Sequence, residues 1–105
     1  MLQEHIPFLF LYSINNQKED VQLFINSVCN DINILPYFEK YAVTYRIDNN
    51  GVYIFQCGLC TLAECRCDKY IAGRMKYMLR DLYYDKKTWV YFKKFGVELV
   101  TDGTV

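Results

Sequence analysis

Alternating hydrophobic and polar residues mark a hairpin in the middle of the chain. Between residues 41 and 48, β-branched and aromatic residues alternate with polar ones, which is the period-2 pattern of a half-buried strand. The sequence Asp-Asn-Asn-Gly follows at residues 48–51, and Asn and Gly tolerate the positive φ that tight hairpins require. Val52–Gln56 provides the return strand. We therefore predict an antiparallel hairpin over these residues.

A period of three to four residues predicts two amphipathic helices. The first spans residues 17–33, and the second spans residues 62–84, beginning at a capping box, Thr61-Leu62-Ala63-Glu64. The apolar stripe of the first helix consists of Val21, Phe24, Ile25, Val28 and Ile32. The apolar stripe of the second consists of Ala63, Cys67, Ile71, Met75, Met78 and Leu82. A basic row projects on the opposite side of the second helix and consists of Arg66, Lys69, Lys76 and Arg80, with Gly73 in the same row.

Three further segments have the composition of strands: Ile6–Tyr12, Trp89–Phe92 and Phe95–Val100. The resulting order, β-α-β-β-α-β, predicts an α+β fold in which an antiparallel sheet carries both helices on one face, the ferredoxin-like order. An alternative order, α-β-β-β-α, results if Thr61–Cys67 is a strand and the last helix begins near Asp68. The capping box favours the first order.

Composition and length predict one ordered domain over residues 1–105, with a loose tail at residues 101–105. The run Ile6–Tyr12 is too short to cross a membrane, and no Lys or Arg precedes it as in a secretory signal. We expect an intracellular, cytoplasmic protein without a membrane partner. Net charge is zero, but residues 66–94 hold nine Lys or Arg against three Asp, so positive charge is concentrated in one region.

Four of the five cysteines lie within eleven residues, at Cys57, Cys60, Cys65 and Cys67. Four thiolates can fill the tetrahedral shell of a structural zinc, and a Cys-x-x-Cys pair before a helix can also support redox chemistry. A helix from residue 62 would point Cys65 and Cys67 in nearly opposite directions, which disfavours zinc. The remaining interpretation treats Cys29, Cys60 and Cys67 as small apolar packing groups. We therefore expect no cofactor, with zinc as the alternative.

Two surfaces are candidates for binding. A basic helix face with aromatic edges can contact phosphates and stack bases, and its candidate residues are Arg66, Lys69, Gly73, Lys76, Tyr77 and Arg80. The second surface combines apolar bulk with strand propensity near the C-terminus and predicts a homodimer or partner contact through Trp89, Tyr91 and Phe95.

No catalytic set is visible, because His5 is the only histidine and neither paired carboxylates nor a glycine-rich phosphate loop stands out. The leading hypothesis is a small, non-enzymatic interaction or regulatory protein that dimerises through its last strand and its basic helix face. The first alternative is a nucleic-acid-binding module that uses the same helix. The second is a zinc- or thiol-dependent site at the cysteine cluster.

Overall fold

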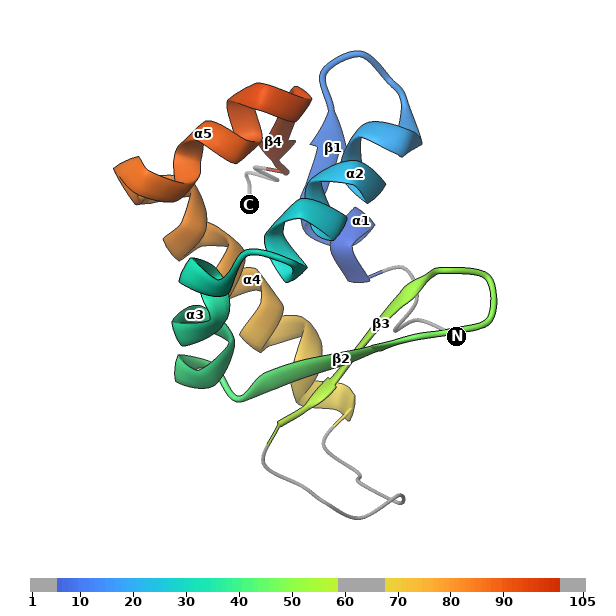
Figure 1. The fold of residues 1–105 in the computed structure, drawn as a ribbon, viewed down its shortest axis with the longest axis vertical. Coiled ribbons are helices and arrows are strands. Elements are labelled where there is room, and N and C mark those ends of the chain that lie inside the picture. Colours follow the sequence, from blue (N-terminus) through green and yellow to red (C-terminus); the bar gives the residue numbers. More distant parts are fainter. Residues whose placement is uncertain (1–5, 59–67, 101–105) are drawn as a thin grey trace.

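Two separate pairs of antiparallel strands form the β part of the described structure. The computed structural model of the protein describes residues 6–58 and 68–100. Strand β1 (Leu11–Ser13) pairs with β4 (Val97–Leu99), and β2 (Val43–Ile47) pairs with β3 (Tyr53–Cys57). Figure 1 shows the β2–β3 hairpin crossing the end of a long helix, whereas β1 and β4 lie together in another part of the molecule.

The other regular elements of the described residues are helices. They are α1 (Ile6–Phe10), α2 (Lys18–Cys29), the 3-10 helix η2 (Ile32–Ile34), α3 (Leu35–Lys40), α4 (Asp68–Tyr84) and α5 (Lys86–Phe95). Helix α4 runs from the hairpin to α5 and also packs against α1 and α3 (Figure 1). The protein is therefore a small compact α+β domain, as the sequence predicts.

One hydrophobic core connects these elements. Helix α2 packs on α5 through Phe24 and Phe92, whose ring centroids are 4.5 Å apart. Tyr83 of α4 meets the same Phe92 ring edge-on at 4.9 Å. Phe55 of β3 and Val97 of β4 are buried in the same core. These contacts hold α4 in a fixed orientation, with one side turned inward and the other toward solvent.

The strongest periodic patterns predict the elements correctly. The hairpin forms as expected, and the Asp48 side chain accepts hydrogen bonds from the backbone N–H groups of Asn50 and Val52 at its turn. Helix α2 buries the predicted stripe as far as Val28, but the helix ends at Cys29. The predicted burial of Ile32, the fifth member of the stripe, is wrong, because Ile32 lies in η2 and is 76% exposed.

One predicted strand is a helix, and another is a helix over most of its length. Trp89–Phe92 lies inside α5, and residues 6–10 form α1, whereas Leu11 and Tyr12 are extended in β1 as predicted. The ends of α5 explain why Trp89–Phe92 is helical: the Asp85 carboxylate accepts a hydrogen bond from the Lys87 N–H, and Gly96 ends the helix in the left-handed conformation with φ 64°. Only Val97–Leu99 of the last predicted strand is extended. A single four-stranded sheet is consequently absent from the described residues, and the predicted strand order is not confirmed.

The start of the second predicted helix is only partly described. Helix α4 covers Asp68–Tyr84, whereas the capping box and the alternative strand Thr61–Cys67 lie outside the described residues, as does the expected tail 101–105. No helix in the described part of the chain has both the length and the apolar character needed to cross a membrane.

Candidate binding surface on helix α4

The side of α4 that faces away from the core carries three tyrosines at intervals of seven residues. Tyr70, Tyr77 and Tyr84 are 55%, 56% and 73% exposed, respectively. Gly73, Lys76 and Arg80 lie between them in the sequence and are exposed as well. We call these six residues the α4 face. Because tyrosine is usually at least partly covered in a folded protein, three exposed rings on one helix form an unusual surface.

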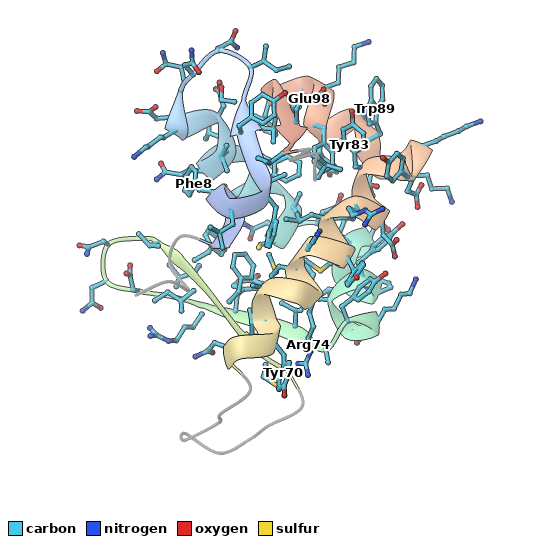
Figure 2. The ribbon with its side chains drawn as sticks, turned by 180° about the vertical axis from the view of Figure 1, so that it is seen from behind. Phe8, Tyr70, Arg74, Tyr83, Trp89 and Glu98 are labelled. Atoms are coloured by element: carbon cyan, nitrogen blue, oxygen red, sulfur yellow. The ribbon has the colours of Figure 1, made fainter. Side chains whose placement is uncertain are left out.

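The opposite side of α4 explains why this face is exposed. Its apolar residues are all buried and consist of Ile71, Met75, Met78, Leu79 and Leu82. In a helix, side chains three and four positions apart share one side, so burying this stripe turns the α4 face outward. The predicted burial of Ile71, Met75, Met78 and Leu82 is confirmed, as is the predicted exposure of Lys76 and Arg80. Figure 2 views the molecule from behind, with α4 in front of the hairpin and Tyr70 near its first turns.

Positive charge and aromatic rings are in direct contact on this face. The Arg80 guanidinium lies 6.0 Å from the centroid of the Tyr77 ring, within the range of a cation–π interaction. No acidic residue belongs to the α4 face as defined. Asp81, which follows Arg80 in the sequence, accepts hydrogen bonds from Tyr41 and from Lys40, the latter at 3.1 Å. The Tyr41 hydrogen bond is the main cause that lowers the pKa of Asp81.

Gly73 is not required by the fold of the described residues. A Cβ atom built at this position meets no heavy atom within 4 Å. Its φ is not in the left-handed region that favours glycine, since among the glycines that the structure describes only Gly51 and Gly96 have positive φ. A glycine inside a helix costs about 1 kcal/mol relative to alanine. No close contact within the described chain calls for a glycine at this position.

The remaining members of the predicted basic row are only partly placed. Lys69 lies in the first turn of α4, and Arg66 lies outside the described residues. Sequence periodicity identified the cations, Gly73 and Tyr77 as candidates, while Tyr70 and Tyr84 appeared only as an edge of the basic face. The structure brings the tyrosines onto the same exposed face, and their intervals of seven residues were the signal that could have identified them.

The second predicted surface, near the C-terminus, is mostly used within the chain. The Tyr91 hydroxyl donates a hydrogen bond to the Asp31 carboxylate, and Phe95 is half-buried against the core. Trp89 is 39% exposed, and the Lys93 ammonium lies 5.7 Å from its ring centroid. The assignment of Trp89, Tyr91 and Phe95 to a strand edge is wrong, because these residues belong to α5; the dimer contact itself stays a prediction. Figure 2 shows Trp89 close to Tyr83 and Glu98, and the Tyr83 hydroxyl donates to Glu98 at 2.8 Å.

The cysteine cluster is described only at its first member. Cys57 ends β3, is buried, and lies 3.2 Å from an Arg74 guanidinium nitrogen. Cys60, Cys65 and Cys67 lie outside the described residues, and no group of three metal ligands occurs in residues 6–58 and 68–100. Zinc therefore stays an untested alternative. Cys29 is also buried, and this burial raises its pKa to about 12, which is typical of an unreactive packing thiol.

Two carboxylates beside a small hollow have a structural role. Asp31 caps η2 and Asp85 caps α5, and their side chains also accept hydrogen bonds from Tyr91 and Tyr37, respectively. The hollow between them is about 440 Å³ in volume. Because both carboxylates have backbone and tyrosine donors, we assign them to helix capping.

Comparisons with known proteins provide no relative for this chain. No family model matches it, and neither the curated proteins nor the solved structures contain a significant match. The functional argument therefore depends on the residues themselves.

Proposed function

We propose that this protein is a non-enzymatic interaction module that binds a protein partner through the α4 face. The observation that carries the proposal is the row of exposed tyrosines, Tyr70, Tyr77 and Tyr84, which runs beside Arg80 and Gly73 on one rigid helix. Tyrosine and arginine are enriched in the residues that dominate the energy of protein interfaces. A helix already packed on a core also loses little conformational freedom when a partner binds.

Site-specific photo-crosslinking tests this proposal. A benzophenone amino acid replaces Tyr77 or Tyr84 in the full chain, and a control chain carries the same group at the exposed position Thr44 on β2. We expect the same protein to be crosslinked from both α4 positions and not from residue 44. Changing Lys76 and Arg80 together to Glu should abolish this crosslink while the circular dichroism spectrum stays native. Equal crosslinking from residue 44, or none from α4, would contradict the proposal.

Nucleic acid is the second candidate, and the cations favour it. Lys76 and Arg80 adjoin the exposed rings, and bases stack on tyrosine in many single-strand-binding proteins. Binding of labelled single- and double-stranded DNA and RNA, measured by fluorescence anisotropy at low salt, decides this alternative. Affinity that falls steeply with salt and is lost in Lys76→Ala with Arg80→Ala would favour nucleic acid, because released counterions supply such affinity. Absence of binding to all four would leave the protein partner as the proposal.

A further inference from the structure

We propose that helix α5 docks on an anionic lipid surface, with its lysines against the headgroups and Trp89 at the boundary between headgroups and acyl chains. This contact goes beyond the function proposed above, because it concerns a different helix and a different partner. The expectation of a protein without a membrane partner rested on the lack of a spanning or signal segment. Contact with the surface of a bilayer requires neither segment.

The exposed side of α5 is basic from its first turn to its last. The ten residues of the helix include four lysines and no acidic residue, and all four lysines are exposed. Trp89 and Val90, between these lysines in the sequence, are 39% and 53% exposed. At about 100° per residue, these six residues fall within about 160° of arc on the helix surface. We call them the α5 face, which consists of Lys86, Lys87, Trp89, Val90, Lys93 and Lys94.

The other side of α5 fixes the orientation of this face. Thr88 and Phe92 are buried there, where α5 packs against α2 and α4. The Phe92 ring meets Phe24 of α2 and Tyr83 of α4. Figure 1 shows α5 at the edge of the molecule. The α5 face is therefore held on the outside by the core itself.

The positive charge of the α5 face is not neutralised within the described residues. No salt bridge in residues 6–58 and 68–100 joins one of its lysines to a carboxylate. The carboxylate of Asp85, just before the helix, accepts hydrogen bonds from the Lys87 backbone N–H at 2.8 Å and from the Tyr37 hydroxyl. Lys86 and Lys87 also lie in the first turn, where the helix dipole disfavours positive charge. Helix stability does not account for their placement, whereas attraction to an anionic surface does.

The residue types of the α5 face favour lipid over other anionic partners. Lysine is depleted in protein interfaces, and arginine is the usual residue for bidentate binding of a carboxylate or phosphate. Clustered lysines provide instead the diffuse attraction by which proteins bind anionic headgroups. Tryptophan is enriched at the membrane–water interface, and the exposed Val90 adds apolar area beside it. The Lys93 ammonium lies 5.7 Å from the Trp89 ring centroid, where it competes with the stacking of a nucleic-acid base.

Trp89 is the only tryptophan of the chain, so its fluorescence reports directly on this contact. We expect the full chain to cosediment with vesicles of phosphatidylcholine mixed with phosphatidylserine, and not with vesicles of phosphatidylcholine alone. Binding should shift the Trp89 emission to shorter wavelength, because the ring leaves water. Added salt should weaken binding, because it screens the charges of the lysines.

Lys86→Gln combined with Lys87→Gln tests the role of charge. A lysine near an anionic surface should increase the affinity about five-fold, so the double variant should bind the mixed vesicles about 25-fold more weakly. The matched control is Lys18→Gln combined with Arg46→Gln, which removes two exposed cations from α2 and β2 and should bind nearly as tightly as the wild type.

Trp89→Ala tests the role of the ring, and cosedimentation with the mixed vesicles should weaken. Its control, Tyr12→Ala, removes a ring that is 48% exposed on β1 and should leave cosedimentation unchanged. Circular dichroism of every variant shows whether the fold is retained.

Three results would overturn the proposal. The first is no binding to the mixed vesicles at low salt, and the second is binding that leaves the Trp89 emission unchanged. The third is an equal loss of binding in the lysine double variant and its control, which would assign the effect to net charge. A short single-stranded oligonucleotide that shifts the Trp89 emission, when the vesicles do not, would assign the α5 face to nucleic acid instead.

Discussion

At the scale of single residues, three tyrosine hydroxyls connect the η2–α3 region to α4 and α5. Tyr37 donates to Asp85, Tyr41 to Asp81, and Tyr91 to Asp31. These hydrogen bonds are the main cause that lowers the pKa of each aspartate and raises the pKa of each tyrosine. Each of the three pairs consists of a tyrosine hydroxyl and an aspartate carboxylate, so their contributions to stability depend on pH in the same way.

The sign of that dependence is fixed by the direction of the shifts. An aspartate with a lowered pKa in the folded state contributes stability above its unfolded value, about 4, and loses it as the pH falls further. A tyrosine with a raised pKa contributes stability below its unfolded value, about 10, and loses it as the pH rises further. We therefore expect a plateau of stability between these limits and a decline on both sides.

Tyr91→Phe tests one pair separately. Removing the hydroxyl should return the pKa of Asp31 toward its ordinary value, because that hydroxyl is the largest cause of the shift. Carbon-13 NMR of the side-chain carboxyl group measures this pKa directly, and Asp81 serves as the internal control, since its partner Tyr41 is unchanged. An unchanged Asp31 titration would contradict the assigned hydrogen bond.

The two sides of α4 should respond very differently to truncation. Met78 is 1% exposed, so Met78→Ala should reduce the free energy of unfolding by about 2–5 kcal/mol, as other core truncations do. Lys76 is exposed, and Lys76→Ala should change it by less than about 0.5 kcal/mol. Urea unfolding at low protein concentration provides both values. Similar costs at the two positions would mean that the assigned orientation of the helix is wrong.

At the scale of elements, Gly58 and Gly73 differ in the space that surrounds their Cα atoms. At Gly58, a Cβ would lie 3.0 Å from the Ala42 carbonyl carbon and 3.1 Å from its oxygen. The same carbonyl accepts the Gly58 N–H at 2.7 Å, so the two backbones cannot separate without losing that hydrogen bond. Glycine is therefore needed where β3 ends beside the start of β2.

Gly58→Ala and Gly73→Ala should shift stability in opposite directions. The first forces backbone atoms apart and should lower the melting temperature. The second adds a methyl group in open space on a helix and should increase the free energy of unfolding by up to about 1 kcal/mol. Thermal melts in dilute solution, where self-association does not contribute, measure both. A destabilising Gly73→Ala change under these conditions would show that this position is crowded within the single chain.

Sequence periodicity predicts an element well where one face is buried and the other is exposed to solvent. Helix α4 and the hairpin meet this condition, and their buried residues follow the expected pattern. Helix α5 does not, because Trp89, Val90 and Tyr91 combine strand propensity with partial exposure. Its identity depends instead on its ends, where Asp85 caps the first turn and Gly96 closes the last. Such capping signals are short and easily attributed to a loop.

Part of the α4 face could also be predicted from helical periodicity. Lys76, Arg80 and Gly73 fall opposite the apolar stripe of α4, so periodicity places them on the exposed side. The involvement of Tyr91 and Phe95 in the fold could not be predicted, because it depends on α5 packing against α2 and on the hydrogen bond to Asp31. Contacts between segments distant in sequence leave no periodic pattern.

At the scale of the whole molecule, positive charge gathers on two consecutive helices. Residues 68–95 include α4 and α5 and hold most of the basic residues of the chain, whereas the first turn of α2 contains Glu19 and Asp20 after Lys18. The protein is therefore neutral overall but electrically asymmetric, and such asymmetry orients an approaching partner more than it strengthens the final complex. With a negatively charged partner, added salt should accordingly slow association more than it speeds dissociation.

The pairing of β1 with β4 determines when the fold can close. Leu11 and Leu99 face each other although they stand near opposite ends of the described chain, whereas the two strands of the hairpin are neighbours in sequence. Closing so long a loop costs entropy before its contacts form, so this sheet should assemble after the transition state for folding. Val97→Ala, at a fully buried position of β4, should therefore accelerate unfolding and leave the refolding rate nearly unchanged in stopped-flow experiments. Strand β4 would then set the unfolding rate, and so the lifetime of the folded molecule, and would have little effect on the folding rate.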